Sequence, residues 1–401
     1  MDSTKLASKL RTNFRTYSMI LALIFIWLLF GFLTDWIFFS PRNLSNLFRQ
    51  MTIISFLAIG MVLVIVTGNG NIDLSVGSAT GLTSAFAAYL QANIWPTVLP
   101  NLLHGVPETS IGMISTVLTV ILTLIVGLLI GLWQGTLIAR LEIPAFIVTL
   151  GGMLIFRGGV LGITQGKTIV PIEDSLRLIA QGYISKNIGL ILALITVILI
   201  FYSTFNTRKM QRTYGFEVKP LLNDLLKAVF FSILILGYVL IMNDYRGIQN
   251  PVLLMAVVAV IFSYLTKNTR FGRYVYALGG NKEATRLSGV NIRKTFFRVF
   301  VLMGLLTGVA GIVLTGYVAA GTIGGGTGYE LSAIASCVIG GTSLLGGEGT
   351  IIGALVGSLI MASLENGMSV MNMNIFWQYI IKGLVLIFAV YMDIASKKMK
   401  S

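Results

Sequence analysis

Apolar residues gather in twelve long runs that are separated by shorter polar segments. A helix needs about 20 apolar residues to cross the hydrocarbon core of a bilayer, and most of the runs approach that length. Open strands leave backbone groups unsatisfied in lipid, so each run is predicted to be helical. The pattern predicts an all-α, polytopic integral membrane protein with about ten to twelve transmembrane helices. The runs cover residues 17–39, 51–68, 72–92, 112–135, 143–165, 187–205, 222–242, 249–266, 296–319, 329–345, 348–366 and 375–393.

Two of the runs differ from the others in composition. The segments 72–92 and 329–345 are rich in glycine and serine, which weaken a continuous helix. Each segment can therefore be either a full span or a broken or re-entrant helix, which is why ten to twelve spans are expected.

The polar segments between the runs are too short to hold a core of their own. The chain is therefore predicted to form one transmembrane permease-like domain over residues 17–395, with short tails at 1–16 and 396–401. The first apolar run is long and lacks a small-residue cleavage pattern, so it is predicted to be a retained span.

Basic residues are distributed unevenly between the two sides of the predicted membrane. With the N-terminus inside, 21 of the 29 Lys and Arg residues lie on the inner side, six lie outside and two lie within spans. Lys and Arg are retained on the cytoplasmic side of short loops. Both termini are therefore predicted to be cytoplasmic. The inner loop 266–298 is the most basic, with eight basic residues and one acid.

Composition excludes several functional classes. Only 11% of residues are charged, against about 25% in soluble domains. The net charge of +14 resides mainly in loops that flank spans, as topology requires, so no nucleic-acid partner is expected. One cysteine, Cys337, and one histidine, His104, are present. They provide no disulfide, no His-rich metal site and no hydrolytic triad within the membrane.

Two glycine-rich stretches superficially resemble nucleotide-binding loops. Residues 162–168 have three residues between their glycines where a phosphate loop has four, and the segment 347–353 places its last glycine one position late. Both also lack the preceding strand that these motifs need. Any ATP used by this protein must therefore be bound and hydrolysed by another chain.

Polar residues inside membrane segments are costly unless they are paired or face a water-filled path. Asn69, Asp73 and Ser75 join the second and third apolar runs, while Thr342 and Ser343 lie in the glycine-rich break at 340–350. One interpretation is helix capping at a tight turn. The alternative is a broken-helix site that offers amides and hydroxyls to a polar solute.

A second polar group combines two bases and two acids: Arg157, Glu330, Glu365 and Lys382. The predicted topology places them toward the outer half of the membrane. They can form structural ion pairs at helix ends, or they can form an outer gate or a docking surface for an external partner.

Taken together, several motifs resemble the permease of a bacterial ABC sugar importer of the ribose, xylose, galactose and arabinose type. The extra segment around 206–245 resembles the longer xylose permeases. The motifs are IDLSVGS at 72–78, IPAFIVTLGG at 143–152, GRYVYALGGN at 272–281 with SGVN at 288–291, and GYEL at 328–331 with GGTSL at 340–344.

The resemblance assigns a role to the basic loop. Permeases of ABC importers carry the pattern Glu-Ala-Ala, three residues, Gly, which forms a coupling helix against the ATPase. Here Glu283, Ala284, Arg286 and Gly289 fit that segment, while Thr285 departs from the third position. A short helix with a charged face and a glycine stop suits such a contact.

The resemblance also implies partners. It implies that two permeases form a homodimer in the lipid of the bacterial inner membrane. On the cytoplasmic side it implies an ABC ATPase subunit that binds ATP and Mg²⁺, and on the other side a periplasmic or extracellular sugar-binding protein. No cofactor is expected in this chain, and no enzymatic activity. The sugar is expected to be a pentose such as xylose, and the path would include Asn69, Asp73, Ser75, Thr342 and Ser343.

Three alternatives stay open. Permeases of the same superfamily import nucleosides or branched-chain amino acids. An ion-coupled secondary carrier would need acids deep in the membrane as ion or proton sites, whereas the acids here cluster at the ends of spans. A membrane scaffold or receptor would transport nothing.

Overall fold

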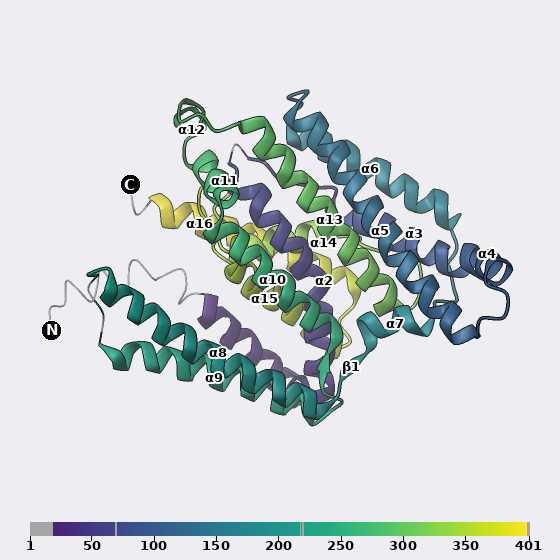
Figure 1. Cartoon of the computed structure of the whole chain (residues 1–401), viewed down its shortest axis with the longest axis horizontal. Coiled ribbons are helices and arrows are strands. Elements are labelled where there is room, and N and C mark those ends of the chain that lie inside the picture. The colour runs from purple at the N-terminus through teal and green to yellow at the C-terminus, as the bar shows by residue number, and fades with distance from the viewer. Residues whose placement is uncertain (1–18, 69, 217, 219, 399–401) are drawn as a thin grey trace.

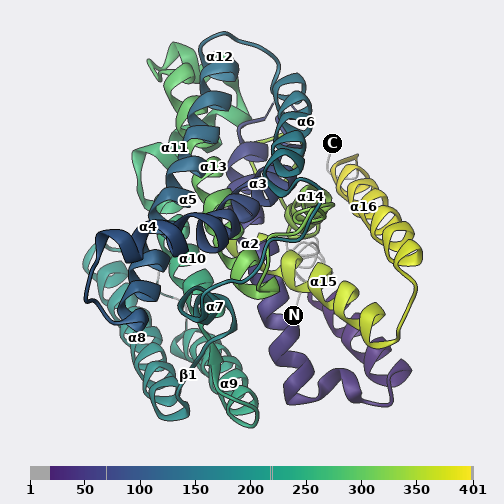
Figure 2. The ribbon, with the colours of Figure 1, turned by 90° about the vertical axis from the view of Figure 1, so that its right-hand side faces the viewer.

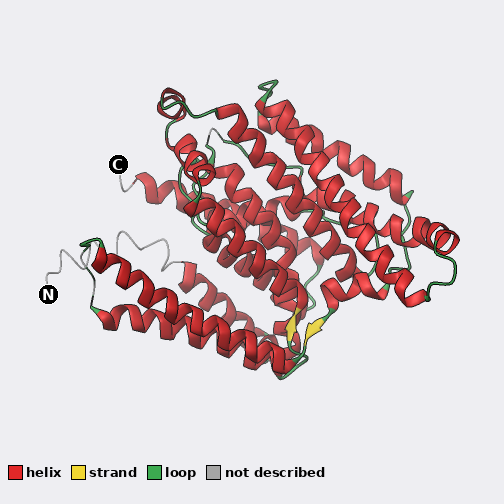
Figure 3. Ribbon diagram, in the orientation of Figure 1, coloured by secondary structure: helices red, strands yellow, loops and turns green. Residues whose placement is uncertain are grey.

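The computed structural model describes residues 19–68, 70–216, 218 and 220–398, and it is almost entirely helical (Figures 1 and 3). The predicted tail 1–16, Asn69 and the last residues of the predicted tail 396–401 lie outside the described residues. The helix Met19–Leu33 comes first. It is followed by α2 (Pro41–Val66), α3 (Val76–Tyr89), α4 (Trp95–Leu102), α5 (Glu108–Ala139), α6 (Ala145–Thr164), α7 (Asp174–Gln181), α8 (Lys186–Thr213), α9 (Leu221–Asn243), α10 (Asn250–Asn268), α11 (Arg270–Gly280), α12 (Lys282–Leu287), α13 (Ile292–Val318), α14 (Tyr329–Ile339), α15 (Ile351–Val370) and α16 (Ile375–Lys398).

Four short elements complete the described chain. A 3₁₀ turn, η1 (Ile37–Phe39), precedes α2, and a π-helical turn, η2 (Leu90–Ile94), joins α3 to α4. The strands β1 (Tyr183–Ile184) and β2 (Ile248–Gln249) form a two-residue antiparallel ladder that pairs Tyr183 with Gln249. This ladder joins the chain segments on either side of the α8–α9 hairpin.

The all-α membrane fold predicted from the apolar runs is confirmed. Among the described residues, nine helices are long and apolar enough to cross a bilayer: α2, α5, α6, α8, α9, α10, α13, α15 and the α16 segment Ile375–Ala395. Three of the twelve runs hold shorter helices instead. These are the helices Met19–Leu33, α3 and α14, the last two of 14 and 11 residues. In the run 329–345, α14 ends at Ile339, so this run is broken, which is one of its two expected forms. In the run 72–92, α3 begins at Val76 and continues with helical backbone through η2 into α4, past the end of the run.

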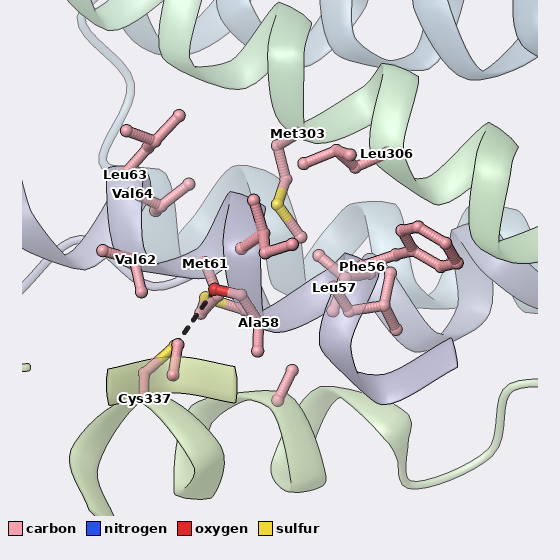
Figure 4. Close-up of a cluster of buried hydrophobic side chains, with 14 of the residues drawn as sticks. Phe56, Leu57, Ala58, Met61, Val62, Leu63, Val64, Met303, Leu306 and Cys337 are labelled. Carbon is pink, nitrogen blue, oxygen red and sulfur yellow. Dashed lines mark hydrogen bonds between the residues drawn. The ribbon is translucent and has the colours of Figure 1, made fainter. Parts of the chain in front are cut away.

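The core lies around α2, in which 94% of the most apolar 18-residue stretch is buried. Its side chains pack against α13 and α14, where Phe56, Met61, Met303 and Leu306 interlock (Figure 4). Cys337 lies in the same core, and its Sγ donates to the carbonyl oxygen of Ala58 at 3.3 Å. The only cysteine therefore serves as a buried packing residue.

Glycine allows α5 and α13 to approach closely. A β-carbon built at Gly127 would lie 2.5 Å from the carbonyl oxygen of Gly304, and one at Gly131 would lie 2.6 Å from that of Phe300. Such contacts between backbones hold helices together in lipid, where hydrophobic burial gives little drive for association.

The bundle has two distinct ends. One end carries α11 and α12, and the other carries α4, α7 and the β1–β2 ladder (Figure 1). That the α12 end faces the cytoplasm stays a prediction from the distribution of basic residues. Seen from the α4 end, α14 lies between α6 and α16 (Figure 2).

Candidate functional site

The stretch predicted as a coupling helix folds as a separate short helix, α12, at one end of the bundle. Asn281 caps it, because its Oδ1 accepts a hydrogen bond from the amide of Ala284 at 2.9 Å. Gly289 follows the helix with a φ of +79°, a conformation that L side chains rarely adopt. A local cap and a local stop thus define α12, and of the two the sequence predicts the glycine stop.

The departure at Thr285 is accommodated within the helix. Thr285 is 5% exposed, and its hydroxyl donates to the carbonyl oxygen of Asn281 at 2.7 Å. A threonine in place of the usual alanine therefore leaves no unsatisfied polar atom.

The outer face of α12 is charged and accessible. Arg286 Nη2 lies 2.9 Å from Glu283 Oε2, and both side chains are about two-thirds exposed. Leu287 is 82% exposed beside them. An exposed leucine flanked by a charge pair is suited to contact with another protein surface.

A cavity of about 570 Å³ separates α12 from the turn between α5 and α6. Arg293 Nη2 and Glu142 Oε1, which lie 2.6 Å apart, join the two sides of this region. Its polar lining residues are Asn71, Glu142, Lys282, Arg286, Asn291 and Arg293.

Helix α11 ends directly before α12 and contacts two glycine-rich loops. The amide of Gly347 donates to the carbonyl of Val66 at 2.9 Å. Gly279 of α11 lies against both, because a β-carbon there would overlap the Val66 carbonyl. The hydroxyl of Tyr276 also donates to the carbonyl of Gly349 at 2.7 Å. The support of α12 is therefore joined to the loops 67–75 and 340–350.

In the loop 67–75, Asp73 and Ser75 are hydrogen-bonded to each other directly before α3, whose N-cap residue is Ser75. Asp73 is 1% exposed, and its Oδ1 accepts from the amide of Ser75 at 2.9 Å and from the Ser75 hydroxyl at 2.6 Å. Gln134 Nε2 of α5 donates to the same hydroxyl at 2.6 Å. The Asp73 carboxylate thus closes the tight turn before α3, whereas the side chain of the N-cap residue Ser75 makes no capping bond to the helix. A contribution of these residues to the path stays a prediction, and Asn69 lies outside the described residues.

The loop 340–350 places Thr342 and Ser343 inside the protein. They are 0% and 2% exposed, and the Ser343 hydroxyl accepts from the amide of Leu345 at 3.2 Å. Thr342 Oγ1 has no hydrogen-bond partner among the described residues. In this conformation both side chains face the packed loops, so their predicted place on a path would need these loops to move.

The four charged residues of the second cluster have different partners. Lys382 Nζ lies 3.0 Å from Glu365 Oε1, which also accepts from the Ser332 hydroxyl at 3.2 Å. Arg157 instead donates to the carbonyl of Ile323 at 3.1 Å and to the hydroxyl of Thr327. Of the expected acid–base pairs, the described residues show the one between Lys382 and Glu365.

The segment 319–328 enters the bundle and leads into α14. A side chain at Gly81 would overlap the carbonyl of Gly325, and one at Gly77 would overlap the Glu330 carboxylate. The first turns of α3 and α14 therefore meet inside the protein, with Arg157 of α6 holding the incoming segment. Carbonyl acceptors carry no side-chain pattern, so the sequence could not indicate this contact of Arg157.

Comparison with known proteins matches residues 43–390 to the family described as branched-chain amino acid transport system / permease component. The xylose transport system permease protein XylH of Haemophilus influenzae is 43% identical over 387 residues, which cover 96% of this chain and 98% of that protein. The protein of the same name from Escherichia coli K12 is 41% identical, covering 96% and 93%. The ribose import permease protein RbsC of Escherichia coli K12 is 33% identical, covering 89% and 87%. No solved structure matches the chain.

Proposed function

The chain belongs to the family of branched-chain amino acid transport system permease components, and from that membership we propose that it is the membrane-spanning subunit of an ATP-driven pentose importer, with xylose as its substrate. The observation that carries the proposal is identity of 41–43% to two xylose transport system permease proteins over 96% of the chain. The nine long apolar helices and the exposed α12 agree with this function.

Within this function, α12 is the contact with a separate ATPase. Its exposed Leu287 and Glu283–Arg286 pair form the docking face. ATP and Mg²⁺ would be held by that partner, while a sugar-binding protein would deliver xylose at the opposite, α7 end. Residues 17–395 would act as one permease domain, in which the segment 269–291 between α10 and α13 folds as α11 and α12.

A homodimer would complete the sugar path, and α6 offers a face for it. β-Carbons built at Gly151, Gly158 and Gly162 would meet nothing within 4 Å, and Phe146 and Leu154 on the same helix are more than half exposed. Glycines spaced by four residues allow close helix pairing in lipid. The path would then run beside α6 and α14, where Arg157 and Glu330 lie.

Uptake in reconstituted vesicles tests the function. The permease would be combined with the ATPase and the sugar-binding protein of the same transport system, with ATP inside the vesicles. We expect ATP-dependent accumulation of labelled xylose. Transport of leucine instead of xylose would favour the amino-acid branch that the family description names. Uptake driven by an ion gradient without any ATPase would contradict the proposal.

Cysteine cross-linking tests the dimer separately. The natural Cys337 is buried and is the only cysteine, so Gly158→Cys and Gly162→Cys introduce one reactive thiol each. We expect oxidation to yield covalent dimers from these variants. Gly237→Cys on α9, another position where a β-carbon meets nothing, is the matched control and should remain monomeric.

A further inference from the structure

The α8–α9 hairpin lies along one edge of the bundle (Figure 1). In the most apolar 18-residue stretch of each helix, only 11% of the residues of α8 and 22% of those of α9 are buried. Most of the surface of this hairpin is therefore open to lipid. Near the α7 end, the Tyr238 hydroxyl donates to Gln249 Oε1 at 2.7 Å and the Tyr238 ring packs against Phe48. At the α12 end, Arg208 of α8 and Asp224 of α9 form an ion pair.

Beside this ion pair lies a cavity of about 340 Å³. Three of its described lining residues are cationic, and none of them is acidic. Asp224 neutralises one of these cations, because it pairs with Arg208, whose side chain is 9% exposed. The other two, Lys209 and Arg212, are exposed and have no ion-pair partner among the described residues. The described lining residues are Phe205, Arg208, Lys209, Arg212, Thr213 and Leu221.

The position of the cavity along α8 matches the level of lipid headgroups. Arg208 follows Lys186 by 22 residues, which span about 33 Å of helix, and the hydrocarbon core is about 30 Å thick. Phe205 and Leu221 provide an apolar edge toward the hydrocarbon. Tyr214 and Phe216, each 68% exposed, follow α8 as aromatic residues do at a membrane interface.

We propose that this cavity binds the phosphate of an anionic phospholipid, which would insert its acyl chains along the exposed faces of α8 and α9. Lys209 and Arg212 contact the phosphate, while Arg208 is held in position by Asp224. The apolar edge formed by Phe205 and Leu221 favours a lipid over a soluble phosphate, since a soluble ion does not need it. A merely topological role for these cations would predict no preference among individual lipids.

Native mass spectrometry of the purified full-length permease tests the proposal, with phosphatidylglycerol and phosphatidylcholine added at equal concentration. We expect retention of phosphatidylglycerol, and about thirtyfold weaker retention in the K209Q/R212Q variant, because each of the two bases removed contributes about 1 kcal/mol near an anionic surface. The matched control is K267Q/R270Q, which removes two charges at the same end of the bundle. It should bind lipid as the native protein does.

Charge-retaining exchange separates a binding defect from a folding defect. The K209R/R212K variant should retain phosphatidylglycerol to within about twofold, provided that charge is what binds. Equal retention of both lipids, or equal losses in the two glutamine variants, would overturn the proposal. Displacement of the lipid by an equal concentration of glycerol phosphate would assign the site to a soluble phosphate and would also overturn it.

Discussion

The amide of Gly347 donates a hydrogen bond to the carbonyl of Val66 at 2.9 Å, which ties the end of α2 to the loop between α14 and α15. Gly279, two residues before the cap of α12, packs against both partners. Motion of α12 would therefore reach the loops 67–75 and 340–350 through contacts between backbones, without any flexible side chain between them. Rigid connections of this kind suit a permease whose halves rock against each other.

We expect Gly279→Ala to disrupt this junction. A β-carbon at Gly279 would overlap the carbonyl of Val66, whereas one at the adjacent Gly280 would meet nothing within 4 Å. Overpacking of a closely packed contact costs roughly 1–3 kcal/mol. Thermal melting of the purified protein should show a lower midpoint for Gly279→Ala and little change for Gly280→Ala. Equal midpoints in the two variants would mean that the junction is loose.

The charge pair on α12 allows a test of coupling by charge exchange. An exposed pair at this spacing contributes only about 0.2–0.5 kcal/mol to helix stability, so Glu283→Arg should leave the protein inserted and folded. If Glu283 binds the ATPase, both Glu283→Arg and the exchanged variant E283R/R286E should lose ATPase co-purification and uptake. If it only stabilises α12 through Arg286, the exchange should restore both. The measurements are affinity co-purification and xylose uptake.

Local and non-local features of this chain differed in how far they could be predicted. Gly289 ends α12, and the apolar runs correspond to most of the long helices. Both features could be predicted because they depend on residues that are neighbours along the chain. The contact of Gly279 with Val66 and Gly347 joins three distant segments through glycine and backbone, which leave no hydrophobic or charge pattern. Arg157 was expected to pair with acids, yet its observed acceptors include carbonyl oxygens. The orientation of the termini and the path residues stay predictions.

Replacement of Arg157 should impair transport more than folding. Its guanidinium binds the Ile323 carbonyl and the Thr327 hydroxyl together, which fixes the segment that enters the bundle before α14. The planar fork of arginine reaches both acceptors, and the single ammonium of lysine does not reproduce it. We expect both Arg157→Gln and Arg157→Lys to reduce uptake about tenfold or more, since a charged hydrogen bond contributes about 1.5–3 kcal/mol.

The control for Arg157 is Arg177→Gln on α7. Arg177 pairs with Asp174, whose side chain is 88% exposed, and such surface pairs contribute about 0–1 kcal/mol. Uptake should be unchanged in this variant. Full activity of Arg157→Lys would show that positive charge alone is sufficient and that the fork geometry has no role.

The Lys382–Glu365 pair can be separated into structural and functional contributions by a double-mutant cycle. Each side chain is about a fifth exposed, so Lys382→Met leaves a largely buried carboxylate and should destabilise the protein by about 2–4 kcal/mol, somewhat less than for a fully buried pair. Glu365→Gln should likewise leave an uncompensated ammonium. The double variant K382M/E365Q contains neither charge. The amide oxygen introduced by Glu365→Gln can still accept a hydrogen bond from the Ser332 hydroxyl. The stability of the double variant should therefore return close to that of the native protein. Chemical unfolding followed by tryptophan fluorescence measures these differences.

Uptake by the double variant then decides between the two interpretations of the cluster. Native uptake would assign the pair to structure alone, whereas a stable protein that fails to transport xylose would assign the pair to the gate.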